Sequence, residues 1–223
     1  IRSVYVFSRP EWTALVTTPK MGIKTVADLK GKRVAVTRGT DPHIFLIRAL
    51  QEAKLTEKDV KLVLLQHQDG RTALERGDVD AWAGLDPLMA AAEVESGATL
   101  FYRNPGANTL GVLNVREEFA QRNPALVDRV LKVYEEGRKL AIAEPASVKQ
   151  VLITATKLPD AVITRQLERT DFSDPSFTPA RKQTIIAAGL ALQEAGLIKP
   201  DVDVRETVRT LIDDRPIKSA QAQ

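Results

Sequence analysis

"VAVTRGTDPHIFLIRAL", residues 34–50, contains the strongest local indication of the fold. A short apolar run rich in valine ends at Arg38, and Gly39-Thr40-Asp41-Pro42 separates this run from a helical pattern. Glycine permits a tight corner, and a polar capping residue followed by proline is typical of the first turn of a helix. The stretch therefore predicts a buried strand, a sharp corner and a helix in immediate succession.

The same order of strand, corner and helix recurs twice. "KLVLLQHQ", residues 61–68, runs into Asp69-Gly70-Arg71, and "DAWAGL", residues 80–85, runs into Asp86-Pro87. This alternation predicts an α/β fold with a parallel or mixed sheet. Helices that follow parallel strands begin at the carboxyl edge of the sheet, where ligands bind. We therefore expect Asp41, Asp69 and Asp86 to cap three helices whose starts face one cleft.

The chain changes character after residue 103. "NPGANT", residues 104–109, breaks the alternation, and one more strand is predicted at 110–115. Almost everything beyond it is helical, beginning at Asn123-Pro124. Further helices are expected near 145–156, 159–169, 178–195 and 204–212. The last residues, "IKSAQAQ" at 217–223, predict a frayed tail.

The composition favours binding over catalysis. The chain has no cysteine, which excludes disulfides and thiolate chemistry. The net charge of +3 is spread along the chain and aromatic residues make up only 5%, so we expect no nucleic-acid partner. No G-x-S-x-G motif, phosphate-binding glycine loop or histidine pair at metal spacing occurs. We expect a protein that is not an enzyme and that uses neither a cofactor nor a metal.

The free amides at helix starts can hold a small anion such as a sulfonate, phosphate or carboxylate. The Gly39 and Thr40 amides, the Thr40 hydroxyl and the Arg71 guanidinium are the candidate anion contacts. Asp86 is a candidate acceptor for an ammonium or hydroxyl group of the ligand. The competing interpretation of the three aspartates is helix capping alone, which would satisfy some of these amides with their own carboxylates.

Three further residues are candidates on position alone. His43, in the first turn after the Gly39 corner, either bonds the ligand or is a packed helix residue. Trp12, at a strand start, is either a ligand platform or part of the core. Asn108, in the break at 104–109, is placed where a hinge residue could face the cleft. Trp82 alternates with alanines inside a strand, which predicts a core role.

Three separated motifs resemble those of periplasmic solute-binding proteins of the sulfonate, taurine and nitrate type, a group related to the thiamine-pyrimidine-precursor binding proteins. The motifs stand in the order found in that family. They are "IKTVADLKGKRVAVTRGT" at 23–40, "TALERGDVDAWAGLDPLMAAAE" at 72–93 and "GVLNVREEFAQRNPALVDRVLKVYEEGRK" at 111–139. By this resemblance Gly39, Thr40, His43, Arg71, Asp86 and Asn108 are the ligand-binding positions. Leu85 stands where many members have an aromatic residue, which leaves the solute uncertain.

The resemblance implies a type II periplasmic-binding-protein fold, in which two lobes close on a small anionic solute for delivery to an ABC-transporter membrane permease. Such a protein would be periplasmic or lipid-anchored outside the cytoplasm. Residues 1–22 would be a fragment of lobe 1 and the first crossover, 23–104 would be lobe 2, and 105–223 the second crossover and a helical return to lobe 1. Family members carry further chain before the position of Ile1, so we expect part of lobe 1 to be absent and its apolar face to be open to association.

Two alternatives remain open from the sequence. One is a pyrimidine-precursor binding protein or a related enzyme of that pathway, in which His43 would act. The other is a ligand-sensing regulatory domain.

Overall fold

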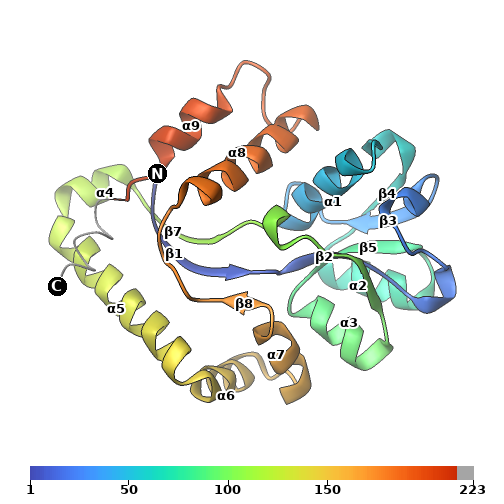
Figure 1. Cartoon of the computed structure of the whole chain (residues 1–223), viewed down its shortest axis with the longest axis horizontal. Coiled ribbons are helices and arrows are strands. Elements are labelled where there is room, and N and C mark those ends of the chain that lie inside the picture. The colour runs from blue at the N-terminus through green and yellow to red at the C-terminus, as the bar shows by residue number, and fades with distance from the viewer. Residues whose placement is uncertain (215–223) are drawn as a thin grey trace.

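The computed structural model describes residues 1–214, and in Figure 1 these form two sheets that are linked by crossing segments and flanked by helices. The predicted tail at 217–223 lies outside the described residues. The strands are β1 (Arg2–Pro10), β2 (Thr13–Thr17), β3 (Arg33–Val36), β4 (Lys61–Leu64), β5 (Ala81–Leu85), β6 (Thr99–Tyr102), β7 (Gly111–Val115) and β8 (Thr170–Asp171). The α-helices are α1 (Asp41–Glu52), α2 (His67–Arg76), α3 (Leu88–Ser96), α4 (Glu117–Arg122), α5 (Pro124–Ala143), α6 (Pro145–Thr156), α7 (Asp160–Leu167), α8 (Pro179–Glu194) and α9 (Val204–Leu211).

A five-stranded mixed sheet forms one half of the molecule. Its strand order is β4-β3-β5-β2-β6. β3 pairs in parallel with β4 and with β5, whereas β2 pairs antiparallel with β5 and β6. The predicted α/β class is therefore confirmed, and the three strands that end in the repeated corners are the parallel ones.

The boundary of the second lobe differs from the one expected at residue 23. β2 hydrogen-bonds to β5 and β6, so residues 13–17 belong to the five-stranded sheet and not to a lobe 1 fragment. The first crossing consequently lies between Pro10 and Thr13, where β1 ends and β2 begins. The second crossing includes a 3-10 turn, η4 (Pro105–Ala107), within the predicted break.

The helical return does not stay with the first lobe. Ala90 and Ala91 of α3 share a buried cluster with Val162 of α7, so α7 packs on the second lobe. α8 also contacts α1, and Gln51 of α1 is hydrogen-bonded to Glu194 of α8. Residues 105–214 therefore contact both lobes, which corrects the expectation that the chain from residue 105 onward rejoins lobe 1 alone.

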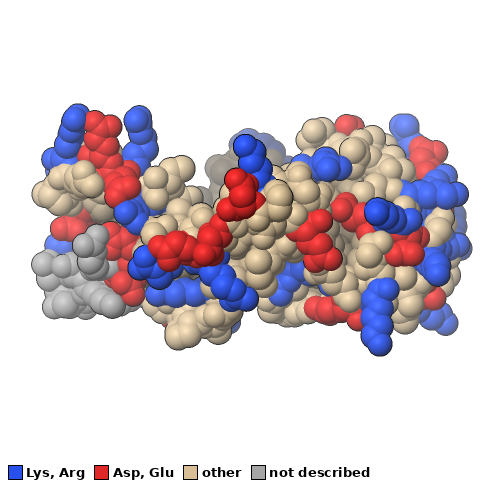
Figure 2. All heavy atoms as spheres, turned by 90° about the horizontal axis from the view of Figure 1, so that it is seen from above, with Lys and Arg blue, Asp and Glu red and all other residues tan. Residues whose placement is uncertain are grey.

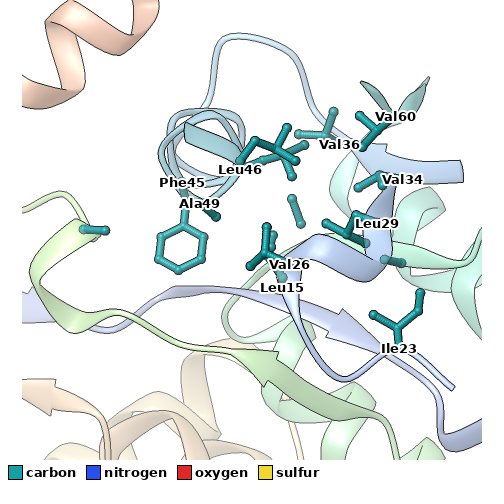
Figure 3. Packing of buried hydrophobic residues seen from close by; sticks show 14 residues of the cluster. Leu15, Ile23, Val26, Leu29, Val34, Val36, Phe45, Leu46, Ala49 and Val60 are labelled. Atoms are coloured by element: carbon teal, nitrogen blue, oxygen red, sulfur yellow. The ribbon is translucent and has the colours of Figure 1, made fainter. Parts of the chain in front are cut away.

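α1 covers one face of the five-stranded sheet. In Figure 3 Phe45, Leu46 and Ala49 of α1 point toward Leu15 and Val34 of the sheet. The other face carries Trp82, which is 1% exposed and confirms the predicted core role. A methyl group at Gly70 would come within 2.8 Å of the indole Nε1, so α2 approaches this face closely only because residue 70 lacks a side chain.

The sequence predicts that the three corner aspartates cap their helices in the same way. In the structure they do not. Thr40 is the N-cap of α1, and Asp41 is already its first helical residue. α2 begins at His67, so Asp69 lies inside its first turn. Only Asp86 caps with its carboxylate, which accepts a hydrogen bond from the Ala90 amide at 2.9 Å.

The second sheet has the order β7-β1-β8 and is covered by α5. Leu131 of α5 is fully buried against Val4 and Tyr5 of β1. Beside this contact the Tyr5 hydroxyl donates to Glu135 at 2.8 Å, and Arg138 donates to the same carboxylate at 2.7 and 2.9 Å. A buried charged network therefore joins α5 to β1.

Several apolar residues are exposed along α5. They include Leu126, Val130, Val133, Leu140 and Ile142, and Val133 is 65% exposed. The partly exposed Tyr134 ring packs against Tyr5 and Phe7 of β1. Association through an open face of lobe 1 stays a prediction. Charged residues of both signs are interspersed over the face of the molecule shown in Figure 2.

We predict that Glu135→Gln destabilises the protein at neutral pH but not in acid. Arg138 holds the pKa of the Glu135 carboxyl below its ordinary value of 4.5. A carboxyl with a lowered pKa in the folded state adds stability above its unfolded pKa and loses it as the pH falls through the folded pKa. The loss should be about 2 kcal/mol at pH 7 in urea unfolding. It should shrink as the pH falls below 4.5 and through the lowered pKa of Glu135.

Glu136→Gln is the matched control, because Glu136 is the exposed neighbour on the same helix. It should leave the free energy of unfolding unchanged within about 0.5 kcal/mol. An equal loss for Glu135→Gln at pH 3.5 and pH 7 would show that the ionised network does not stabilise the fold.

Candidate functional site

The three predicted corners lie at one edge of the five-stranded sheet. β3, β4 and β5 run parallel, so the starts of α1, α2 and α3 follow from the same carboxyl edge. β2 runs the other way and starts at that edge, because Thr13 pairs with Leu85. The structure therefore brings the corners, Trp12 and the second crossing into one region.

The α1 corner is built from Thr37 to Asp41. Gly39 adopts the left-handed conformation with φ +76, and its amide donates to Nδ1 of His43 at 3.0 Å. The Thr40 hydroxyl donates back to the Thr37 carbonyl at 2.6 Å. Within the described part of the chain, the Thr40 and Asp41 amides have no acceptor. Of the predicted anion contacts, the Thr40 amide is free and the Gly39 amide is already used.

His43 lies inside the protein. Its side chain is 0% exposed, and its Nε2 lies 2.8 Å from Glu57. With Nδ1 occupied by the Gly39 amide, both ring nitrogens have partners. The structure therefore places His43 as an internal support of the corner. It does not bring the imidazole to a solute, nor to a position where it could act in the enzyme alternative.

Trp12 and Thr109 connect the two crossings to the α1 corner. The Trp12 indole donates to the Thr109 hydroxyl at 3.1 Å, and that hydroxyl donates to the Asp41 carboxylate. Trp12 also accepts the Asp86 amide on its carbonyl at 2.8 Å. The indole thus lies beside the corner and not in the sheet core. No sequence pattern indicates the part played by Thr109.

Asn108 is 3% exposed and fixes one crossing to the other. Its carbonyl oxygen accepts the amide and the hydroxyl of Thr13 at 2.8 and 2.9 Å. Its amide nitrogen donates to the Thr13 carbonyl at 3.2 Å. The predicted location at the hinge agrees with this arrangement, but these contacts occupy the side chain, and direct contact with a solute stays a prediction.

Arg71 is not brought to the corners. Its guanidinium donates to Glu75 at 2.8 Å and to Glu95 at 2.6 Å. Glu95 lies at the end of α3, away from the sheet edge where that helix begins. Arg71 would face the cleft if α2 began at Asp69. The helix begins two residues earlier, at His67, and this turns the Arg71 side chain toward α3.

Asp86 is held by a residue that the sequence did not indicate. Arg169 donates to both oxygens of Asp86 at 2.7 and 2.8 Å and to Glu93 at 2.7 Å. The side chains of Asp86 and Arg169 are only 2% and 6% exposed. Burial raises the pKa of the Asp86 carboxyl, although Arg169 acts in the opposite direction. Asp86 is therefore already paired, which corrects its expected role as a free acceptor for the ligand.

A cavity of about 490 Å³ lies next to the Asp86–Arg169 pair. Its walls come from the end of β1, the second crossing, the α7–β8 segment and the start of α8. Three arginines and three acidic residues line it: Arg9, Arg169, Arg181, Glu11, Glu168 and Asp171. This volume suits a small molecule, and the charged walls suit a polar one.

The family assignment rests on a match to the NMT1/THI5-like family, whose model covers residues 1–148, more than half of the 223 residues. The chain belongs to the NMT1/THI5-like family. This membership agrees with the type II periplasmic-binding-protein fold expected from the three motifs, and the solved structures below share that fold.

Relatives of this NMT1/THI5-like chain include proteins described as binding sulfonates. An Escherichia coli protein described as "Putative aliphatic sulfonates-binding protein" is 29% identical over 90% of this chain. The chain spans 63% of that relative's length. The "Taurine-binding periplasmic protein" of Escherichia coli is 32% identical over 56% of this chain and 40% of its own.

Two solved structures are similar in sequence and fold. The periplasmic aliphatic sulphonate binding protein SsuA from Escherichia coli is 27% identical with a TM-score of 0.79, covering 92% of this chain and 68% of its own. The alkanesulfonate-binding protein SsuA from Xanthomonas axonopodis pv. citri, bound to MOPS, is 25% identical with a TM-score of 0.78, covering 96% and 73%. The desulfurization enzyme DSZB, at 14% identity and a TM-score of 0.75 over 99% of this chain and 79% of its own, shares the fold alone.

Across residues 1–214, no group of three or more histidine or acidic side chains is arranged to hold a metal ion. Among the helices of this same part, none combines the length and the apolar character that a membrane span requires.

We predict that Arg169→Leu is strongly destabilising because it leaves the Asp86 carboxylate buried without its partner. Removing one member of a buried pair costs about 3–5 kcal/mol, measured here by urea unfolding at pH 7. Adding Asp86→Asn to Arg169→Leu should recover part of this loss, since it removes the stranded charge.

Arg165→Leu is the control, because Arg165 lies on α7 and pairs with Glu168 where both side chains are about half exposed. Its cost should stay below about 1 kcal/mol. Equal effects of the two arginine substitutions would contradict a special role for the Asp86–Arg169 pair.

Proposed function

We propose that this protein is the substrate-binding component of an ABC importer and that it binds an alkanesulfonate or a similar small anion between its two sheets. The observation that carries the proposal is the α1 corner. There the free Thr40 and Asp41 amides lie at the start of a twelve-residue helix, at the sheet edge where the crossings meet. Such a helix start attracts an anion without any catalytic group.

The sulfonate class is favoured by the relatives' descriptions. Relatives and solved structures that align with most of this chain are described as binding aliphatic sulfonates. The partner would be the membrane permease of the importer, and the location would be outside the cytoplasm. The groups that would bind the anion are the free backbone amides of the α1 corner and Arg38, an exposed basic residue of the same corner.

Asp41 restricts what the corner can accept. Its carboxylate lies in the first turn of α1 and receives the Thr109 hydroxyl. A negative charge at this position opposes an anion while it favours a cationic group on the same solute. A solute with an ammonium group close to its anionic group therefore suits the corner better than a simple anion of the same size.

The proposal is tested by titration calorimetry of the purified protein with taurine, ethanesulfonate, longer alkanesulfonates, nitrate and a thiamine-pyrimidine precursor. Saturable heat with one or more sulfonates is the expected result. Binding of the precursor alone would favour the pyrimidine alternative. Absence of heat with every anion would contradict the proposed function.

We predict that Asp41→Asn increases the affinity for ethanesulfonate about threefold to tenfold, because it removes a negative charge beside the anion. The asparagine oxygen can still accept the Thr109 hydroxyl, so the corner should keep its shape. The affinity for taurine should rise less or fall, since its ammonium group loses a partner. Titration of both ligands into both proteins measures the two changes.

Asp78→Asn is the control, because Asp78 is exposed and precedes β5 at the opposite edge of the sheet. It should leave both affinities unchanged within experimental error. An equal gain from Asp78→Asn would mean that the overall charge, and not the α1 corner, sets the affinity.

A further inference from the structure

His67 occupies a defined position next to the α1 corner that the proposed function leaves unused. It is the first residue of α2, and its Nδ1 lies 3.2 Å from the hydroxyl of Thr37 at the end of β3. That hydroxyl also donates to the Leu65 carbonyl at 2.7 Å. A threonine hydroxyl has one proton to donate, and the Leu65 carbonyl takes it. Nδ1 of His67 must therefore carry a proton and donate to Thr37.

This bond fixes the state of the other ring nitrogen. In a neutral imidazole only one nitrogen carries hydrogen, so Nε2 presents a lone pair. Within the described residues no hydrogen bond to Nε2 occurs. When the ring takes up a proton, Nε2 becomes an N–H donor and the side chain gains a positive charge. His67 can thus change from an acceptor to a charged donor without losing its bond to Thr37.

His67 is linked to the anion-binding residues through Thr37. The Thr37 carbonyl accepts the Thr40 hydroxyl at 2.6 Å, so Thr37 contacts both the α2 and the α1 starts. Partial burial lowers the pKa of His67, and the nearby Asp41 charge acts in the opposite direction. The other charged groups at this edge are the exposed Arg38, which lies within the α1 corner, and Asp69, which lies two residues further along α2. The ring is therefore neutral at pH 7.5 in the free protein.

We propose that protonation of His67 controls the affinity of the α1 corner for its anion, so that the protein binds a sulfonate more tightly in acid than at neutral pH. This inference rests on the proposed function. The neutral ring carries a lone pair at Nε2, whereas the charged ring carries a donor there and offsets the nearby Asp41 charge. By reciprocity, a bound anion must raise the pKa of His67.

The test measures ethanesulfonate affinity by calorimetry at pH 5.5, 6.5 and 7.5 and at one ionic strength. A sulfonate stays ionised throughout this range, so the ligand does not titrate. The wild-type protein should bind about tenfold more tightly at pH 5.5 than at pH 7.5. His67→Gln, which keeps a donor for Thr37 but cannot be charged, should bind with nearly the same affinity at all three values.

His67→Lys is expected to increase the affinity for ethanesulfonate at pH 7.5, a result that a misfolded variant would not give. Its charge persists at pH 7.5, where its affinity should approach that of the wild type at pH 5.5. His43 is the other histidine of the chain, and a contribution from it would persist in both variants. NMR titration of the imidazole protons should in addition show the pKa of His67 rising when ethanesulfonate is added.

The outcomes separate the two proposals. If ethanesulfonate binds but His67→Gln keeps the wild-type pH dependence, the role of His67 is wrong while the proposed function stands. An unmoved His67 pKa on saturation with ethanesulfonate would overturn it in the same way. If no sulfonate binds the wild-type protein at any of the three pH values, both proposals fail together.

Discussion

The parallel pairing of β3 with β4 and β5 is the constraint on which the rest of the molecule depends. Two parallel neighbours cannot be joined by a tight turn, so each strand must be followed by a helix that carries the chain back across the sheet. The helices α1, α2 and α3 consequently start at one edge, and their first turns have nowhere else to lie. Everything that makes this edge a candidate site, including the free amides and His67, follows from that pairing.

Two buried charged networks then attach the remaining helices to this frame. Arg169 connects the α7–β8 segment to Asp86 and Glu93 in the second lobe. The Tyr5 hydroxyl of β1 donates to Glu135 of α5, and Arg138 of the same helix pairs with that carboxylate. Both networks are nearly buried, where charges are stable only with complete hydrogen bonding. They explain how helices that follow the second crossing stay in register with two different sheets, one on each side of the cavity.

Local sequence patterns predict most of the strands and helices, but fewer of the contacts in the candidate site. The glycine and proline corners, the alternating apolar runs and the Asn123-Pro124 helix start act over a few residues, and the strands and helices lie close to their predicted places. The position of β2 in the second lobe was missed because strand pairing is non-local and an isolated strand does not reveal its partner. The two-residue β8 is too short to leave a periodic signal.

Single side chains were harder to place because a small shift of a helix start rotates every later residue. Arg71 was expected at the cleft from a start at Asp69, and a start at His67 turns it to Glu95. Asp86 was correctly placed at the edge, but its partner Arg169 is 83 residues away and has no local signature.

The Asn108 side chain connects the two crossings between the sheets. Its side-chain amide bonds both the N–H and the carbonyl of Thr13, so sliding one crossing past the other would break both bonds. A reorientation of the two halves that keeps these bonds is a rotation with its torsional changes in the peptide units beside the two residues.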